Sequence, residues 1–223
     1  YNEEVAYHVL CSSIIRHSSV PVCIIPLQLS NLKGIYTRPR DPKQSNEFSF
    51  TRFLVPYLCD YVGKAIFMDC DMLIRHDIKE LLSLLEDDKA VAVVKHDYTS
   101  KVSEKYLGTK QYAYPRKNWS SVMVFNNSHS GCKKLTLKYV NNAPALDLHR
   151  FKWAEDNRIG ELPKEWNHLV GEYNLNPDAK LVHFTVGGPY FDEYADCEYS
   201  EEWMKEAKYT LHCTQLGDIK DVG

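Results

Sequence analysis

The chain has 223 residues, of which 44% are hydrophobic and 26% are charged. This composition is that of an ordinary globular protein, and the length suffices for one large α/β domain with a complete core. The net charge of −3 gives no electrostatic reason to expect a nucleic-acid partner, and no apolar run is long enough to form a transmembrane segment.

The seven cysteines are scattered along the chain, and no two of them form a C-x-x-C pair. An odd, scattered set argues against a disulfide framework and against a structural zinc site. We therefore expect reduced cysteines and a cytoplasmic location. The polar, acidic start at Tyr1 does not resemble a signal peptide, and the missing initiator methionine predicts that an N-terminal segment precedes it.

Periodic apolar residues define the elements expected in the first sixty residues. Ala6, Leu10 and Ile14 recur at every fourth position, which indicates one face of an amphipathic helix. Pro26 lies within the next apolar run, and a proline in a strand favours an edge position. The predicted elements are, in chain order, a helix over residues 2–17, an edge strand over 21–29, a loop over 30–48 and a helix over 50–62.

The most informative segment is a short apolar run that ends in two acids. Residues 64–68 (KAIFM) predict a buried strand, and Asp69 and Asp71 come directly after it. Asp77 then stands at the N-cap of a predicted helix, with Glu80 at the position of a capping box. The two acids are therefore expected at the carboxyl end of a strand.

Strands and helices alternate through the rest of the chain. This alternation predicts an α/β fold with a mixed, mostly parallel central sheet flanked by helices, in which ligands lie beyond the carboxyl ends of the strands. No repeat or linker divides the sequence, so residues 1–223 are expected to form one domain. The predicted elements are a strand over 90–95, a binding loop over 98–117, a strand over 120–125, a helix over 129–141, a strand over 180–184, a turn over 187–189 and a helix over 200–213.

Asp69 and Asp71 carry carboxylates that repel each other when buried, and a divalent cation relieves that repulsion. Mg²⁺ and Mn²⁺ are commonly held by one or two carboxylates together with substrate phosphates. His183, near the end of a predicted strand, is a candidate third ligand, and an imidazole favours Mn²⁺ over Mg²⁺. Gly187 and Gly188 would let backbone amides approach a phosphate. The alternatives are a solvated acidic loop, a half-buried histidine and an ordinary turn.

Four segments resemble motifs of the glycosyltransferases akin to family 8, and they occur in that family's order. Its strand, D-x-D and D-I-x-x-L segment is matched by GKAIFMDCDMLIRHDI, and its aromatic-x-R segment before the D-x-D is matched by SFTRFLVP. NWSSVMVFN is similar to its middle strand, and LPKEWN followed by HFTVGGP is similar to its closing motifs. The resemblance covers about residues 49–191 and extends to viral and bacterial relatives.

The resemblance implies a GT-A-type fold and a hexosyltransferase. Such an enzyme moves a sugar from a nucleoside-diphosphate sugar, a UDP- or GDP-sugar, to the hydroxyl of a glycan or glycoconjugate. It implies Mn²⁺ (or Mg²⁺) held by Asp69, Asp71 and His183, and a first, base-binding strand that should precede Tyr1. Together with the strand-end residues His96 and Asp97 and the two glycines, the candidates at the donor or acceptor are Arg52, Asp69, His96, Asp97, Asn118, Ser120, Gly187 and Gly188.

Glu155 and Asp156 are the candidates for a catalytic carboxylate at the reacting sugar. Asp156 would be the general base of an inverting enzyme, whereas a retaining enzyme needs no strong base, and the sequence leaves this open. The alternative roles are structural: a surface salt bridge for Arg52, strand capping for Asn118 and Ser120, and the polar start of a helix for Glu155 and Asp156.

Two positions depart from the family's pattern. Gly188 stands where the family has a lysine that contacts the donor phosphate, and Ser121 replaces a glycine of the middle strand. Another cation is therefore expected to supply the positive charge. Two other functions remain open: a sugar nucleotidyltransferase, and a non-catalytic carbohydrate-binding domain of the same fold.

Overall fold

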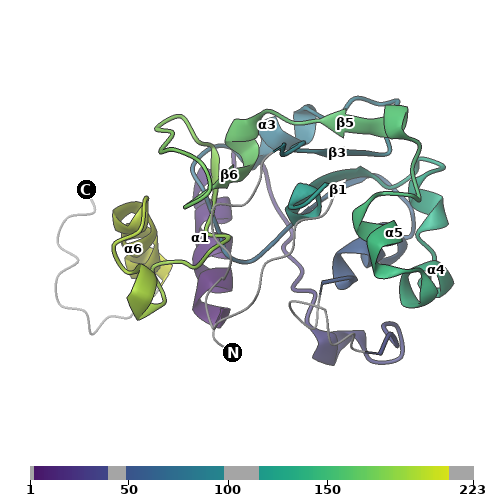
Figure 1. Ribbon diagram of the computed structural model, residues 1–223, viewed down its shortest axis with the longest axis horizontal. Helices are drawn as coiled ribbons and strands as arrows, with labels where there is room; N and C mark the ends of the chain where they lie inside the picture. The colour runs from purple at the N-terminus through teal and green to yellow at the C-terminus, as the bar shows by residue number, and fades with distance from the viewer. Residues whose placement is uncertain (1–2, 40–48, 98–115, 211–223) are drawn as a thin grey trace.

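Two mixed β-sheets lie at the centre of the computed structural model, which describes residues 3–39, 49–97 and 116–210 (Figure 1). The four-stranded sheet has the order β1-β4-β3-β5, and the three-stranded sheet has the order β2-β7-β6. Their strands are β1 (Lys64–Met68), β2 (Met72–Ile74), β3 (Val91–Val93), β4 (Val122–Asn126), β5 (Ile159–Glu161), β6 (His168–Leu169) and β7 (Leu181–His183).

Strand directions in the larger sheet decide where the polar ends of the strands meet. β4 is antiparallel to both β1 and β3, and β3 is parallel to β5, so β1, β3 and β5 all run in the same direction. The carboxyl ends of β1 and β3 and the start of β4 therefore lie at the same end of the strands. The prediction of an α/β fold with a mixed sheet is confirmed, but three of the five pairings between the described strands are antiparallel, so the expectation of a mostly parallel sheet was wrong.

Sequence and position in the sheet explain how deeply each strand is buried. β4 (VMVFN) is rich in β-branched and aromatic residues, which favour strands, and its first four residues are buried in the interior of the sheet. β1 (KAIFM) lies at the sheet edge and is only partly buried, so the expectation of a buried strand there was wrong. An edge strand has a neighbour on one side only, and this leaves part of its surface accessible.

Helices cover both ends of the sheets. α1 (Glu4–His17) buries Ala6, Val9, Leu10 and Ile14 and packs against β2 and α6 (Ser200–Thr210), as Figure 1 shows at the left of the molecule. At the other end lie α2 (Val55–Leu58), α4 (Leu137–Asn142) and α5 (Ala145–His149). Among the described residues, no helix combines the length and the apolar character needed to cross a bilayer.

The helix after the two acids begins as predicted. α3 (Ile78–Ser83) has Asp77 at its N-cap, where the carboxylate accepts a hydrogen bond from the backbone N–H of Lys79 at 3.0 Å. Glu80 instead pairs with Lys180. The cap fixes the start of α3 a few residues after Asp71.

Several expected elements differ in the structure. Residues 21–28 form no strand, because Pro21 and Pro26 lack the N–H groups that a ladder requires. The helices expected over 50–62 and 129–141 are each split into a short 3₁₀ turn and a short α-helix. Most of the predicted binding loop and the end of the last helix, residues 98–115 and 211–213, lie outside the described residues. The 3₁₀ turns are Leu29–Leu32, Thr51–Leu54, Trp119–Ser121, Cys132–Lys134, Asp156–Arg158, Lys164–Asn167 and Asp192–Tyr194.

Candidate metal and donor site

Three potential ligand atoms meet where the two sheets approach each other. One atom each from Asp69, Asp71 and His183 lie within 4.8 Å of one another. Among residues 3–39, 49–97 and 116–210, this is the one group of three such side chains close enough to share an ion. The structure thus brings together the two acids, which were predicted at the end of a strand, and His183, which was predicted as the third ligand.

Backbone pairing positions these three side chains. Asp69 follows β1, and its N–H donates to the carbonyl of Ser121 at 3.0 Å. Asp71 precedes β2, which is antiparallel to β7 with Met72 opposite His183. The N–H of Phe184 donates to the carbonyl of Asp71 at 2.9 Å and extends this ladder by one bond. The short strand β2, which sequence patterning did not predict, is what brings His183 to Asp71.

Arg52 neutralises one of the two carboxylates. Its guanidinium forms a bidentate pair with Asp69, with N–O distances of 2.7 and 3.2 Å, and donates to the carbonyl of Ser120 at 2.8 Å. The Arg52 side chain is only 7% exposed, and its guanidinium lies 4.9 Å from the centre of the Phe67 ring. Arg52 therefore forms a buried salt bridge with a metal-ligand candidate, not a surface one.

Burial and the neighbouring charges have competing effects on the pKa of Asp69. Burial raises the pKa of the Asp69 carboxyl, and the neighbouring Asp71 carboxylate adds to this, while Arg52 and His183 act to lower the pKa. The net effect is a pKa above the ordinary value for an aspartate. A further positive charge nearby stabilises the ionised form of such a carboxyl group, and a bound divalent cation would supply that charge.

His183 is oriented towards the acids by a buried amide. Its Nε2 lies 3.4 Å from Oδ2 of Asp71, and its Nδ1 lies 3.0 Å from Oδ1 of Asn167. His183 is 3% exposed and Asn167 is fully buried. Two carboxylates and an imidazole nitrogen form a donor set that suits Mn²⁺ and other divalent cations, so the residues present fit the predicted ion.

Ser120 and Asn118 lie beside this cluster at the start of β4. The Ser120 hydroxyl is 2.9 Å from Nδ1 of His149, whose ring packs against Phe50 and Phe53 with centroid distances of 5.3 Å. Asn118 has a left-handed backbone with φ of 62°, and its carbonyl accepts hydrogen bonds within the turn. Their predicted contact with a sugar stays a prediction, and the structure adds His149 as a neighbour of Ser120.

His149 should make the folded state sensitive to acid. Burial, together with the guanidinium groups of Arg52 and Arg38, lowers the pKa of His149 to about 3. Below pH ~6.5 the unfolded chain binds a proton here that the folded chain does not, so stability falls as pH falls towards 3. At pH 5 this loss amounts to about 2 kcal/mol for the one histidine.

Replacing His149 by glutamine tests this expectation, because an amide carbonyl can still accept from Ser120 but cannot titrate. In urea unfolding, His149→Gln should lose about 2 kcal/mol less stability than the native chain between pH 7 and pH 5. His76→Gln, at an exposed position, controls for removing a histidine from the chain. Equal losses in the native and His149→Gln chains would show that His149 is not held neutral.

His96 and Asp97 follow β3 and lie at the same end of the strands as Asp69. His96 is buried, its Nδ1 is 2.8 Å from the Tyr173 hydroxyl, and its carbonyl accepts from Nε1 of Trp119 at 2.9 Å. Burial, aided by His183 and Lys164, lowers the pKa of His96 to about 3. Asp97 is exposed. Both residues are thus on the side of the sheet that the sequence predicted, and their role at the donor stays a prediction.

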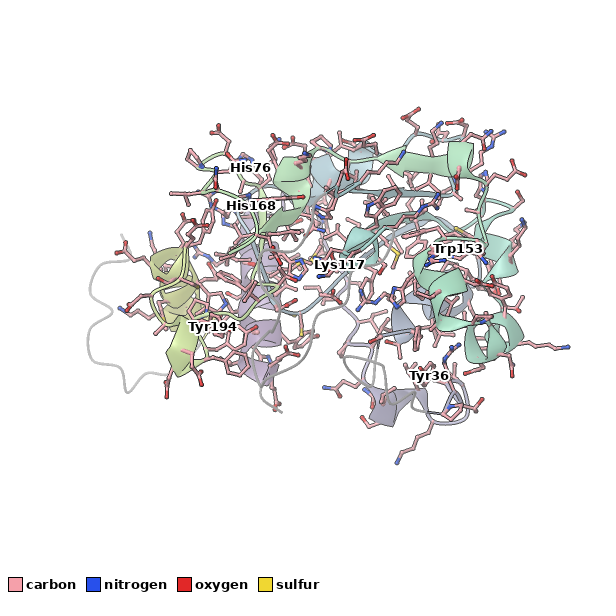
Figure 2. All side chains as sticks on the ribbon, viewed as in Figure 1. Tyr36, His76, Lys117, Trp153, His168 and Tyr194 are labelled. Carbon is pink, nitrogen blue, oxygen red and sulfur yellow. The ribbon has the colours of Figure 1, made fainter. Side chains whose placement is uncertain are left out.

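The two glycines after β7 make room for aromatic rings. A Cβ atom on Gly188 would lie 2.4 Å from Cε1 of Tyr190, and one on Gly187 would lie 2.4 Å from Cδ2 of Tyr194. The position at which the family carries a lysine is thus closed by the Tyr190 ring. Figure 2 shows Tyr194 on the side of the molecule that carries α6. Close packing of tyrosines accounts for both glycines, and their contact with phosphate stays a prediction.

Glu155 and Asp156 are not members of the three-ligand cluster. They precede β5, whereas Asp69 follows β1. Because β5 and β1 run in the same direction, Glu155 and Asp156 lie at the opposite end of the strands from Asp69. The Asp156 side chain is 80% exposed and pairs with Arg116 at 2.7 Å, and Glu155 lines a surface hollow of about 260 Å³ with Lys134 and Arg158. Because the fold does not bring them to the metal ligands, their catalytic role stays a prediction without structural support.

Three contributors to the site were not predicted as functional residues. Asn167 lies within the LPKEWN motif but was not separated from it, and Ser121 was noted only as a departure from the family's glycine. His149 lies in a short helix, α5, that the sequence pattern did not indicate. Hydrogen bonds between residues far apart in the chain leave no periodic signal, which explains why these three were missed.

Known proteins resemble this chain in sequence and in fold. Protein CDI of Arabidopsis thaliana is 46% identical over 211 residues, which are 92% of this chain and 82% of that relative. Among solved structures, the bifunctional glycosyltransferase WbbM matches with a TM-score of 0.66 and 18% identity over 92% of this chain and 48% of its own.

Two further solved structures share the fold. The glycosyltransferase GlyE of Streptococcus pneumoniae TIGR4 matches with a TM-score of 0.57 and 16% identity over 93% of this chain and 58% of its own. The galactosyltransferase LgtC, solved with donor and acceptor sugar analogs, matches with a TM-score of 0.53 and 13% identity over 96% of this chain and 95% of its own. The chain thus spans about half the length of WbbM and somewhat more of GlyE.

These likenesses identify the fold as that of the GT-A glycosyltransferases, as predicted. The model of glycosyl transferase family 8 matches residues 1–188, which is most of the sequence. The chain is therefore a glycosyltransferase and belongs to glycosyl transferase family 8.

Proposed function

We propose that the chain transfers a hexosyl group from a nucleoside-diphosphate sugar, a UDP- or GDP-sugar, to a hydroxyl of a glycan or glycoconjugate. The observation that carries this proposal is the cluster of Asp69, Asp71 and His183, with ligand atoms within 4.8 Å of one another. LgtC, which shares the fold, was solved with donor and acceptor sugar analogs, and this supports the proposed classes of substrate.

Asp69, Asp71 and His183 would hold Mn²⁺ (or Mg²⁺) and leave coordination positions open for the donor diphosphate. When bound, the cation would neutralise the negative charge that develops on the leaving nucleoside diphosphate. Arg52 has a separate part in this proposal. Its guanidinium is bonded to Asp69 and to the Ser120 carbonyl, so it fixes the Asp69 carboxylate in place.

The polar residues at the same end of the strands would line the substrate side of the cluster of Asp69, Asp71 and His183. Ser120 and Asn118 at the start of β4, and His96 and Asp97 after β3, are proposed to contact the donor sugar or the acceptor. Membership of family 8 favours glycosyl transfer over the two alternatives, nucleotidyl transfer and carbohydrate binding without turnover.

The cysteines support a proposed cytoplasmic location. Cys11, Cys23, Cys59, Cys70, Cys132 and Cys197, which are all the cysteines in the described part of the chain, are free thiols. Unpaired cysteines are the norm where glutathione and thioredoxin keep thiols reduced.

Thermal unfolding with candidate donors tests the proposed function. A true donor at 100 times its Kd should stabilise the fold by about 2.7 kcal/mol and raise Tm by roughly 5–10 °C. UDP, GDP and their hexose derivatives would each be measured with Mn²⁺ and with EDTA, and transfer or donor hydrolysis would be assayed for those that bind. A rise in Tm that is independent of Mn²⁺, or no rise with any nucleotide, would contradict the proposal.

A further inference from the structure

A buried chain of hydrogen bonds connects the start of β4 to His183. The Ser121 hydroxyl donates to the Asn118 carbonyl at 2.7 Å, and Nδ2 of Asn167 donates to the Ser121 oxygen at 2.8 Å. Oδ1 of Asn167 then lies 3.0 Å from Nδ1 of His183. Ser121, Asn167 and His183 are all at most 3% exposed.

The direction of every bond in this chain follows from its first member. A backbone carbonyl can only accept, so the Ser121 hydroxyl hydrogen points at Asn118 and the Ser121 oxygen presents a lone pair to Asn167. The amide nitrogen of Asn167 must face that lone pair, which turns its Oδ1 towards His183. Oδ1 can only accept, so the proton of neutral His183 is on Nδ1 and its Nε2 carries a lone pair.

The same ring is exposed to an opposite influence from Asp71. Oδ2 of Asp71 lies 3.4 Å from Nε2 of His183 and would accept a hydrogen from it if the proton were there. In that tautomer Nε2 could not ligate a metal, because its lone pair would be replaced by the N–H bond. The amide of Asn167 therefore opposes the tautomer that the metal-ligand carboxylate alone would favour.

We propose that Asn167 is a positioning residue, ordered by Ser121, that holds His183 in the Nδ1–H tautomer and so keeps Nε2 available to the metal. This inference rests on the proposed metal site. It also gives a defined role to Ser121, which replaces the family's glycine, because the Ser121 hydroxyl sets the orientation of the Asn167 amide.

Mn²⁺ binding to the full chain, measured as free Mn²⁺ by electron paramagnetic resonance, tests the proposal. Asn167→Leu should weaken Mn²⁺ binding by about 10- to 100-fold, the usual effect of losing the hydrogen-bond partner of a ligating histidine. Asn127→Leu is the matched control, because Asn127 is equally buried and donates to the Val62 carbonyl at 3.0 Å, beyond the other end of β4. It should leave Mn²⁺ affinity unchanged.

A second measurement reads the tautomer directly. In ¹⁵N-histidine spectra of the metal-free chain, with the signal of His183 identified by its loss in His183→Gln, the native protein should show Nδ1–H. Asn167→Asp keeps an acceptor oxygen and should retain both this tautomer and most of the Mn²⁺ affinity. Asn167→Leu should populate the Nε2–H form, an effect that loss of stability alone would not produce.

The outcomes separate this inference from the proposed function. No Mn²⁺ binding by the native chain would overturn the metal site itself. Binding by the native chain with equal affinity and an unchanged tautomer in Asn167→Leu would overturn the role of Asn167 alone. If Asn167→Leu does not fold, Ser121→Ala replaces it. A mixture of His183 tautomers and weaker Mn²⁺ binding in Ser121→Ala would support the positioning role of Asn167, and native values for both would overturn it.

Discussion

Asp71→Ala should reduce glycosyl transfer and donor hydrolysis in Mn²⁺ by roughly 1,000-fold or more, because a metal ion contributes several kcal/mol to the stabilisation of transition-state charge. Asp71 offers its carboxylate to the cluster and lies 3.4 Å from Nε2 of His183. Its removal leaves one carboxylate and one imidazole, which is too few protein ligands to hold the ion well. The measurement is kcat/KM with the donor found by thermal unfolding.

Stability should not account for this loss. Asp71 and Asp69 repel each other, and Asp71 contributes to the raised pKa of Asp69, so its removal relieves an unfavourable interaction in the metal-free fold. Asp88→Ala is the control, since Asp88 is an exposed acid that pairs with Lys89 and Arg158. Full transfer activity in Asp71→Ala would remove the basis for the proposed metal site.

The positions of the two acids could be predicted from sequence because they depend on local pattern. A run of four apolar residues before Asp69 and a capped helix after Asp77 define a strand and a helix without help from the rest of the chain. The end of another predicted strand then supplied His183 as a candidate third ligand, and the resemblance to family 8 implied the same role. What no local pattern shows is the contact itself, which depends on the pairing of Met72 with His183 across 111 residues of sequence.

The errors have a similar physical origin. The run over 21–29 has a strand-like composition, but its prolines cannot complete a ladder, and the structure leaves residues 21–28 irregular. Arg52 was expected near the donor, with a surface salt bridge as the structural alternative. The structure replaces that alternative with a buried pair to Asp69, and the place of Arg52 near the donor stays a prediction. Local composition predicts the structure that a segment favours by itself, whereas strand pairing and burial depend on the neighbouring residues in the folded protein.

Arg52 carries the largest expected effect on stability. Arg52→Met should destabilise the metal-free chain by about 3 kcal/mol at pH 7, the lower part of the range for breaking a buried ion pair, because the Asp69 side chain keeps 21% of its surface exposed. The variant leaves the Asp69 carboxylate without its closest cation. Urea unfolding in EDTA measures the free energy of unfolding.

The loss should shrink on acidification. Burial already raises the folded-state pKa of Asp69 above that of the unfolded chain, and removing Arg52 raises it further. The native state then binds more protons than the unfolded state above pH ~4, so the stability of the variant falls as pH rises through that window. His149 acts in the same direction, since Arg52 helps to lower its pKa and the variant loses that effect.

A surface pair of the same chemistry provides the comparison. Arg116 pairs with Asp156 at 2.7 Å, as Arg52 does with Asp69, but the Asp156 side chain is 80% exposed. Arg116→Met should cost less than about 1 kcal/mol for the lost pair. Combining Arg52→Met with Asp69→Asn should recover part of the stability, because no unpaired charge is then buried. Equal losses for Arg52→Met and Arg116→Met, at pH 5 and at pH 8, would mean that the charge of Asp69 is solvated and does not need Arg52.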